Sequence, residues 1–400
     1  MTAIPYTGIF SNCPESWDVT PLQEHVFFQE GPGILAKDFR SSGVPLLRLA
    51  GLGSKFATLD GCNYLDPEMV EKKWSHFRLN LGEIVTSTSA SFGRTSTIDE
   101  STEGAVPYTG IIRFRPKTSR IVPEFIGLFL RSTFFEEQAG SFSAGSVIQH
   151  FGPTHLKQMA IALPPVKEQS SIAEIIGTLE NKIDLLHRQN QTLEAMAGTL
   201  FRQWFVEEVQ EDWEEKSLSG IANFLNGLAC QKYPPKNELE KLPVLKIKEL
   251  SSGVSESSDW ATSEVRPEYI VEAGDVIFAW SASLMVKIWD GERCVLNQHL
   301  FKVTSDEFPK WFYLMWCKHH LAEFISISSS HATTMGHIKR GDLDAARVKV
   351  PPENELKLMS EQMTPLLDKQ IAIAKQSKTL EKLRDALLPK LMSGEVRVAY

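Results

Sequence analysis

Two long stretches of the chain place apolar residues at alternating steps of three and four, the spacing typical of a coiled-coil helix. The predicted seam of the first stretch contains Ile172, Ile176, Leu179, Ile183, Leu186, Leu193 and Leu200. The predicted seam of the second stretch contains Leu366, Ile373, Leu380 and Leu387. Pro164–Pro165 and Pro351–Pro352 precede the two stretches and fix where each helix can begin, whereas Pro389 is expected to disturb the end of the second helix.

Each helix has a length of about 52 Å at 1.5 Å per residue, which is long for the face of one small domain. Two separate amphipathic helices, each packed on its own core, are the simpler alternative. We favour pairing, because a chain that leaves one globular part by the first helix can return along it by the second. This connectivity predicts an antiparallel pair with a globular part at each end. Asn190 lies in the first seam, where a single polar residue usually fixes the register.

The two helices belong to an internal duplication, a feature that decides the fold where it occurs. Thr192–Glu194 recurs as Thr379–Glu381, a shift of 187 (379 − 192), and His150 falls on His337 at the same shift. Earlier segments match in the same order, with residues 44–52 resembling 242–250, 82–91 resembling 274–283, and 110–114 resembling 299–303. We therefore interpret the chain as two copies of one unit, each a globular part followed by a long helix.

Short β-branched runs in both globular parts predict strands, and Phe125–Phe135 and Trp311–Phe324 have helical spacing. The acidic segment Glu207–Glu215 is expected to be a solvated connector. The predicted fold class is mixed α/β (α+β), with two pseudo-symmetric globular domains separated by two long helices in an antiparallel coiled coil. The predicted parts are residues 1–163, a central helix 164–206, residues 207–350, and a C-terminal helix 351–400.

The composition is that of an ordinary globular protein, with 400 residues of which 42% are hydrophobic. Five cysteines without a CxxC spacing argue against a disulfide framework or a zinc finger and favour a reducing compartment. The sequence lacks a long apolar run and a signal-peptide pattern, so a cytoplasmic location is expected.

The sequence contains none of the common catalytic motifs. GxxxxGK[ST], GxSxG and HExxH are absent, as is an Asn-Pro-Pro or Asp-Pro-Pro motif followed by an aromatic residue. His319–His320 is the only adjacent histidine pair, and we predict no metal site there. We therefore expect no catalytic residue and no cofactor in this chain.

Three segments resemble a known family. Leu163–Phe205 resembles the central conserved region of Type I restriction–modification specificity subunits, and Thr379–Val398 resembles their C-terminal conserved region. GDVIFAWSAS and LNQHLFKV (residues 274–283 and 296–303) resemble motifs of their target recognition domains. The resemblance implies a non-catalytic, DNA-binding subunit of a prokaryotic phage-defence system, in which each recognition domain reads one half of an asymmetric bipartite target.

The resemblance also implies the partners. The paired helices would set the spacing between half-sites and dock two methyltransferase subunits, and restriction/translocase subunits would complete the complex on double-stranded DNA. S-adenosylmethionine and ATP with Mg²⁺ are expected in those partner subunits. A dimer-like protein of this kind holds its reading heads about one DNA turn, roughly 34–36 Å, apart.

The net charge of −8 argues against a DNA-binding protein, because such proteins usually present a basic face. Three segments are locally basic: Ile111–Arg120, Lys72–Arg78 and His337–Arg340. We therefore predict that the isolated chain binds DNA weakly and in a salt-sensitive way.

Polar and basic side chains on matched loops are the candidate DNA contacts. In the first copy they are Thr86, Ser87, Ser89, Ser91, Arg94, Arg113, Arg115, Ser146, Gln149 and His150. In the second copy they are Ser281, Ser283, Lys287, Thr333, Thr334, His337, Lys339 and Arg340. Arg113 and Arg115 alternate along a predicted strand and are expected to contact phosphate, whereas Trp280 either stacks on DNA or packs inside. Ordinary solvated loops are the alternative for the serines and threonines.

Two other functions are compatible with parts of the pattern. A non-catalytic scaffold would use the helices to join other proteins, but it would not require two similar Ser/Thr-rich globular parts. An enzyme of another type would require a nucleophile–base pair or a metal cluster, and the sequence shows neither.

Overall fold

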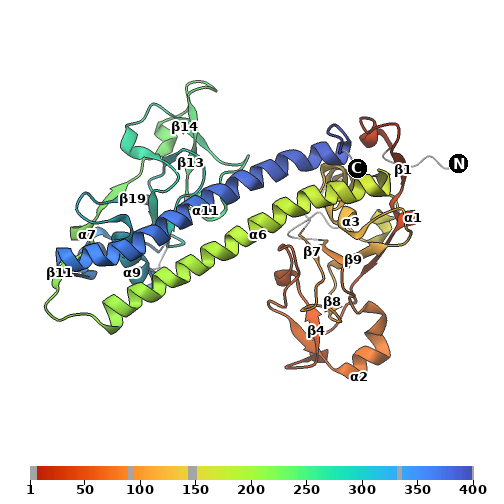
Figure 1. The fold of residues 1–400 in the computed structure, drawn as a ribbon, viewed down its shortest axis with the longest axis horizontal. Coiled ribbons are helices and arrows are strands. Elements are labelled where there is room, and N and C mark those ends of the chain that lie inside the picture. The colour runs from red at the N-terminus through yellow and green to blue at the C-terminus, as the bar shows by residue number, and fades with distance from the viewer. Residues whose placement is uncertain (1–6, 89–93, 143–150, 331–335, 399–400) are drawn as a thin grey trace. The chain divides into compact units, whose positions relative to one another are not determined.

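The computed structural model describes residues 7–88, 94–142, 151–330 and 336–398, and its contacts divide the chain into two units. Unit 1 consists of residues 1–184 and 381–400, and unit 2 consists of residues 185–380. Both long helices contribute one part to each unit, so each unit contains a globular part and a section of both helices (Figure 1).

The globular part of unit 1 contains ten strands and five short α-helices in its described residues. The strands are β1 (Asp18–Pro21), β2 (Val26–Glu30), β3 (Phe39–Arg40), β4 (Val44–Leu47), β5 (Asn63–Leu65), β6 (Ile84–Ser87), β7 (Thr95–Thr97), β8 (Val106–Pro107), β9 (Ile111–Pro116) and β10 (Ala160–Leu163). The helices are α1 (Leu22–His25), α2 (Pro67–Met69), α3 (Pro123–Phe129), α4 (Thr133–Ser141) and α5 (Pro153–Leu156). The long helix α6 follows at Val166–Arg202.

Unit 2 repeats this arrangement. Its strands are β11 (Glu214–Ser217), β12 (Asn223–Asn226), β13 (Lys241–Leu245), β14 (Trp260–Thr262), β15 (Ile270–Val271), β16 (Val276–Ala279), β17 (Met285–Ile288), β18 (Cys294–Leu296), β19 (Leu300–Thr304) and β20 (Arg347–Val350). Its helices are α7 (Leu218–Ile221), α8 (Ile247–Ser252), α9 (Lys310–Ser330), α10 (Arg340–Ala345) and the long α11 (Glu353–Ser393).

The sheets of the two units correspond almost strand for strand. The order β2-β9-β6-β7 in unit 1 matches β12-β19-β16-β17 in unit 2, and the two-stranded pair β1-β10 matches β11-β20. The third sheets, β3-β5-β4-β8 and β14-β13-β18-β15, share a parallel pair, β4 with β8 and β13 with β18. They differ in their fourth strand, which lies beside β5 in unit 1 and beside β18 in unit 2. The duplication in the sequence is therefore a duplication of the fold.

In unit 1, the start of α6 lies beside the end of α11, and the two run in opposite directions (Figure 1). Ile172 and Ile176 share one buried core with Leu391 and Met392. The Glu168 carboxylate is fully buried and accepts hydrogen bonds from Arg397, with Nε–Oε1 2.6 Å and Nη2–Oε2 2.9 Å. Its Oε2 also lies 3.3 Å from Nε1 of Trp17. This ion pair, with a buried carboxylate and a partly exposed guanidinium, joins the segment after α11 to the start of α6.

In unit 2, the second half of α6 pairs with the first part of α11, again in opposite directions. Ala197 and Phe201 share a core with Met363 and Leu367, and the ring Nε2 of His187 lies 2.8 Å from Oγ of Ser377. The predicted seam residues on both helices are buried or partly buried. Asn190 lies in the same section of α6, but its Oδ1 is buried without a hydrogen-bond partner among the described residues. The mixed α/β class and the antiparallel pairing of the long helices are confirmed.

Three local predictions need correction. α11 continues through Pro389 to Ser393, because the last turn buries Leu391 and Met392, and this packing outweighs the loss of one backbone hydrogen bond. The helical pattern over 125–135 is split into α3 and α4, since the Ser132 side chain accepts a hydrogen bond from Phe135 N and starts a new helix.

The acidic segment 207–215 is exposed except at Trp213, but its last two residues belong to a strand. Trp213 is buried in the core of unit 2, and Glu214 and Glu215 belong to β11 with exposed side chains, so the irregular connector ends at residue 212. None of the helices in the described ranges has both the length and the apolar character that crossing a membrane requires.

Candidate nucleic-acid interface

Both units hold a cation on the same strand of the same sheet. In unit 1, Arg113 of β9 donates to the backbone oxygen of Arg78 at 2.7 Å, and its guanidinium lies 3.6 Å from the Glu83 carboxylate. In unit 2, Lys302 of β19 donates to the backbone oxygen of Ile270 at 2.9 Å and lies 2.7 Å from Asp275. These residues occupy matching places in the two copies.

The acidic partners also match. Glu83 accepts a hydrogen bond from the backbone N–H of Asn80 at 3.0 Å, and Asp275 accepts one from Glu272 N at 2.9 Å. In each unit, a carboxylate thus holds the turn three residues before it and neutralises the cation on the neighbouring strand. The pair is an internal support of the sheet.

This support changes the interpretation of Arg113. Its side chain is only 5% exposed and also donates to the backbone oxygen of His76 at 2.8 Å and to Gln29 Oε1 at 2.6 Å. Burial lowers the pKa of the Arg113 guanidinium, and the Glu83 carboxylate partly opposes this shift. A phosphate contact by Arg113 is therefore inconsistent with the structure, because its guanidinium is buried and both Nη atoms donate inside the domain.

Arg115 is the arginine of β9 that reaches the surface. Its side chain is 44% exposed, lies over the Phe27 ring at 4.4 Å, and is 3.6 Å from Glu83. It shares the sheet face of Arg113, as the alternation along the strand predicted, but it keeps its charge accessible to solvent. Arg94 is also exposed, at the start of the segment that leads into β7.

Thr86 and Ser87 are fully buried, so the expectation that they lie on an exposed loop is wrong. Thr86 Oγ1 donates to the backbone oxygen of Arg94 at 3.1 Å, and Ser87 Oγ accepts from Arg94 N at 3.2 Å. Both residues end strand β6, and their hydroxyls bond to the neighbouring strand. Sequence alone did not separate a strand end from the loop that follows it.

The candidates of unit 2 fall into three groups. Ser281 is buried, and its Oγ lies 3.1 Å from Nδ1 of His299. Lys287 Nζ donates to the backbone oxygens of Leu250 and Ser251, each at 3.2 Å. Ser283, His337, Lys339 and Arg340 are exposed, the last three just before and at the start of α10. For the exposed residues, DNA contact stays a prediction.

Seven candidates lie outside the described residues. They are Ser89, Ser91, Ser146, Gln149, His150, Thr333 and Thr334. Their assignment as DNA contacts stays a prediction from the sequence.

Three residues that the sequence did not single out lie at the ends of the matched strands: Glu30, Asn226 and His299. Trp280 Nε1 donates to Asn226 Oδ1 at 3.2 Å, and Gly110 N donates to Glu30 Oε1 at 3.2 Å. His299 belonged to a matched segment, so its signal was present in the alignment of the two copies. Glu30 and Asn226 end strands β2 and β12, whose sequences show no obvious similarity.

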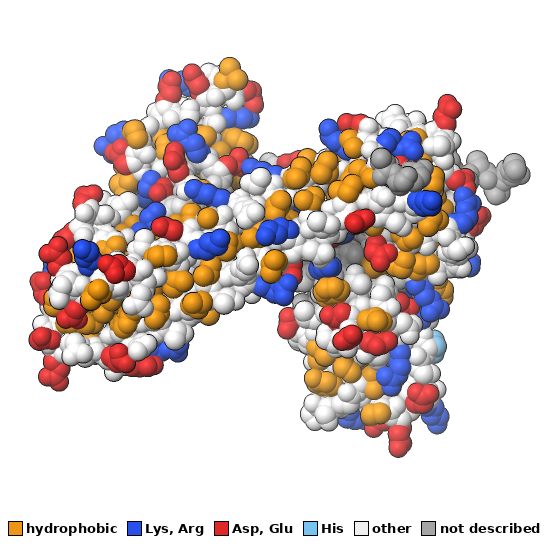
Figure 2. Space-filling model, viewed as in Figure 1, with side chains coloured by type: hydrophobic (Ala, Val, Ile, Leu, Met, Phe, Trp, Pro, Cys, Tyr) orange, Lys and Arg blue, Asp and Glu red, His pale blue; other side chains and the backbone are white. Residues whose placement is uncertain are grey.

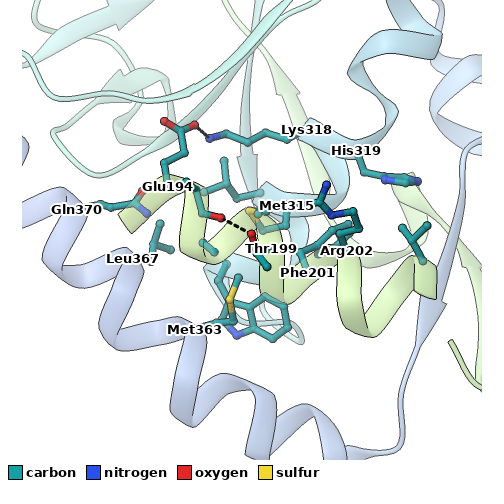
Figure 3. Close-up of a pocket in the computed structure, with 16 residues that line it drawn as sticks. Glu194, Thr199, Phe201, Arg202, Met315, Lys318, His319, Met363, Leu367 and Gln370 are labelled. Atoms are coloured by element: carbon teal, nitrogen blue, oxygen red, sulfur yellow. Dashed lines mark hydrogen bonds and ion pairs between the residues drawn. The ribbon is translucent and has the colours of Figure 1, made fainter. Parts of the chain in front are cut away.

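A groove of about 680 Å³ runs between α6, α9 and α11 within unit 2. Its walls are mainly apolar and include Phe201, Met315 and Met363, and the ion pair of Glu194 with Lys318 crosses one side (Figure 3). Burial and the neighbouring His320 lower the pKa of His319, which lies at the same groove. The titratable side chains that line the groove are Glu194, Arg202, Lys318 and His319, and the first and third of these form an ion pair.

The described residues contain no group of three or more His, Cys, Asp or Glu side chains that could hold a metal ion. His320, the other member of the histidine pair, lies 3.2 Å from Glu323 and 2.9 Å from the backbone oxygen of Arg347. These contacts show that His320 takes part in packing around helix α9.

Comparison with known proteins gives the class. The family model described as "Type I restriction modification DNA specificity domain" matches the chain twice, over residues 14–195 and 210–382. The chain belongs to this family. It is a non-catalytic specificity subunit with two recognition domains, rather than a methyltransferase or an endonuclease.

Individual relatives resemble the chain along its whole length. The MjaIX specificity subunit of Methanocaldococcus jannaschii is 25% identical over 96% of this chain and 94% of its own. The EcoKI specificity subunit of Escherichia coli is 22% identical over 97% of this chain and 90% of its own. The solved S subunit of M. genitalium has a similar fold, with a TM-score of 0.58 over 95% of this chain and 96% of its own at 13% identity.

Proposed function

We propose that each unit reads one half of an asymmetric bipartite DNA target and that the paired helices set the gap between the halves. The observation that carries the proposal is the repeated sheet frame, with the pairs Arg113–Glu83 and Lys302–Asp275 at matching places. Two sheets with the same strand order can contact two similar stretches of DNA backbone. Because the side chains around the frames differ, the half-sites should differ as well.

The proposed complex contains two methyltransferase subunits and, for restriction, translocase/nuclease subunits. S-adenosylmethionine and ATP with Mg²⁺ would act in those partners, and adenine would be the methylated base. The M. jannaschii and E. coli relatives are described as specificity subunits of Type I restriction enzymes, which supports this assignment. We propose the cytoplasm as the location, as expected for a complex that acts on intracellular DNA.

The surface of the long helices supports a docking role. Apolar side chains lie partly exposed to solvent along both helices (Figure 2). In α6 they include Ile175, Leu185 and Met196, and in α11 they include Leu358 and Leu383. We assign this surface to the methyltransferase subunits.

The central experiment is to express the chain with its methyltransferase and to map methylated adenines by long-read sequencing. We expect one motif with two unlike halves and a constant gap, and no methylation when the chain is omitted. A palindromic motif would contradict the division between two different units. Methylation without sequence preference would favour a scaffold instead.

A second experiment tests the docking surface. Leu185→Glu places a charge on the exposed apolar stripe of α6 and should abolish co-purification of the methyltransferase. Gln189→Glu, one turn further along and also exposed, is the control and should leave co-purification intact. Equal recovery of the partner with both variants would locate the docking surface elsewhere.

A further inference from the structure

The two units keep the same backbone bonds around the ends of their central strands. In unit 1, Thr88 N donates to Gly110 O at 2.9 Å, and Phe151 N donates to Thr88 O at 3.4 Å. In unit 2, Trp280 N donates to His299 O at 3.4 Å, and Ile338 N donates to Trp280 O at 3.1 Å. The same strand ends therefore carry Thr88 and Gly110 in one unit and Trp280 and His299 in the other.

One further position completes this correspondence. Asn226 is the last residue of β12 and pairs with Phe301, and Glu30 is the last residue of β2 and pairs with Ile112. Phe301 and Ile112 are matching residues of the duplicated segments, so Asn226 and Glu30 occupy equivalent places. Each stands on the edge strand of its sheet, where its side chain can reach a ligand.

In unit 2 the hydrogen bond from Trp280 fixes which end of the Asn226 amide faces the indole. The indole N–H of Trp280 can only donate, so the amide oxygen of Asn226 must face it, at 3.2 Å. The amide nitrogen then points elsewhere and has no hydrogen-bond partner among the described residues. Asn226 is exposed, so at this position unit 2 presents a hydrogen-bond donor to solvent.

Aromatic packing holds Trp280 in place. Its ring lies 5.7 Å from Phe301 in a stacked arrangement, 6.0 Å from His299 and 6.3 Å from His337. His299 is held in turn by Ser281. The indole is therefore a rigid support for the Asn226 amide.

In unit 1 the equivalent position presents the opposite chemistry. Glu30 Oε1 accepts the backbone N–H of Gly110, so one carboxylate oxygen is used by the protein frame. The second oxygen has no hydrogen-bond or ion-pair partner among the described residues. A carboxylate has no donor when ionised, so unit 1 presents an acceptor where unit 2 presents a donor.

We propose that Glu30 and Asn226 are equivalent base-reading residues and that their opposite hydrogen-bonding character makes the two half-sites different. This inference rests on the proposed function. Glu30 would accept from an exocyclic amino group, that of cytosine or adenine, in the first half-site. Asn226 would donate to a ring nitrogen or carbonyl oxygen of a base edge in the second half-site. Trp280 is a positioning residue that selects which atom of Asn226 faces the base.

Two isosteric substitutions test the proposal. Asn226→Asp keeps the oxygen that accepts from Trp280 and replaces the donor by an acceptor. Glu30→Gln keeps the oxygen that accepts from Gly110 and replaces the acceptor by a donor. Asn223→Asp, exposed at the other end of β12, and Glu100→Gln, exposed in a loop of unit 1, are controls that make the same chemical changes elsewhere.

The measurement is the rate of methyl transfer by the complete complex on duplexes in which each base pair of the target is replaced in turn. Asn226→Asp should lower the rate on the original target about tenfold or more, and a different base pair should be preferred at one position of one half-site. Glu30→Gln should do the same in the other half-site. The gap and the controls should keep the wild-type pattern.

The outcomes separate this inference from the proposed function. If the wild-type complex shows no sequence preference, the proposed function fails. If the wild type is selective but both variants keep its preferences, or lose rate equally on every duplex, Glu30 and Asn226 do not read bases.

Trp280→Phe adds a readout that a purely structural role would not give. It keeps an aromatic ring but removes the N–H that orients Asn226, so the amide can present either its oxygen or its nitrogen. We expect relaxed preference at the Asn226 position and unchanged preference at all others. A uniform loss at every position would mean that Trp280 only supports the fold.

Discussion

The two units differ in the side-chain contacts that join the long helices to the segment just before the first strand of the unit. In unit 1, the buried Glu168 carboxylate binds Arg397 and the indole N–H of Trp17. In unit 2, Trp213 lies just before the first strand, as Trp17 does in unit 1. Its Nε1 has no hydrogen-bond partner among the described residues, and its ring packs against Phe205 at 5.4 Å. The residue that matches Glu168 is Glu355, which is only partly buried.

The chain connectivity explains this difference. In unit 2, α6 continues directly through the acidic connector to Trp213, so the polypeptide itself holds the two segments together. In unit 1, the end of α11 and the segment around Trp17 come from distant parts of the sequence, and only side chains can join them. A charge pair with a buried carboxylate is therefore present where covalent continuity is missing, and apolar contact is sufficient where the chain is continuous.

The strongest test of the comparison is to lengthen both helices by the same number of residues. Four residues inserted after Asn190 and after Ser377 add about one turn, or about 6 Å, to each helix. Because a DNA step is about 3.4 Å, we expect the gap to grow by about two base pairs while both half-sites stay the same. Mapping methylated adenines would check this, and an altered half-site with an unaltered gap would contradict it.

The second prediction compares the internal cations. Arg113→Met leaves the Glu83 carboxylate buried, with Arg115 only partly compensating, and should destabilise unit 1 by about 3 kcal/mol. Lys302→Met should cost about 1–2 kcal/mol, because Asp275 is 24% exposed and can be hydrated. Urea unfolding of the two variants measures both values. A larger effect for Lys302→Met would show that burial does not decide the difference.

A third prediction compares the two helix junctions. Arg397→Ala removes the partner of Glu168 and should cost about 2 kcal/mol, a value reduced by the 44% exposure of Arg397. Gln210→Ala, at the matching place in the other copy, should change stability by less than about 0.5 kcal/mol. Equal losses in urea unfolding would mean that the ion pair does not replace covalent continuity.

The smallest expected effect concerns phosphate contact. Arg115→Ala should weaken DNA binding a few-fold on every sequence and reduce the salt dependence by about one charge, whereas Asn226→Asp should act on one base position only. Gel-shift titrations across salt concentrations with the isolated chain would show this, together with its weak overall binding. Tight binding that ignores salt would overturn the electrostatic argument.

The sequence predicted the features that depend on repetition and periodicity. The apolar steps from Ile172 onward located α6, and the matched segments at 82–91 and 274–283 located strands β6 and β16. It did not predict which polar residues are buried. Arg113 and Arg115 look alike in the sequence, and only the loop at His76–Arg78, which covers one of them, distinguishes their roles.

The reading positions were harder to predict for a related reason. Glu30 and Asn226 match only through the strands that they pair with, since the edge strands β2 and β12 differ in sequence. Their equivalence depends on hydrogen-bond register, which no local pattern reveals. His299 lay in a matched segment, but its contact with Ser281 arises only after β16 and β19 pair.

The exposed carboxylates of Glu207, Glu208, Glu211 and Asp212 have a consequence for how a polyanion approaches unit 2. The segment has no base of its own, although Glu207 lies 3.8 Å from Nε of Arg202, so its net charge would repel phosphates within about 8 Å at physiological ionic strength. If unit 2 binds a duplex as proposed, this repulsion would disfavour approach to the end of α6 and favour encounters at the sheet edges.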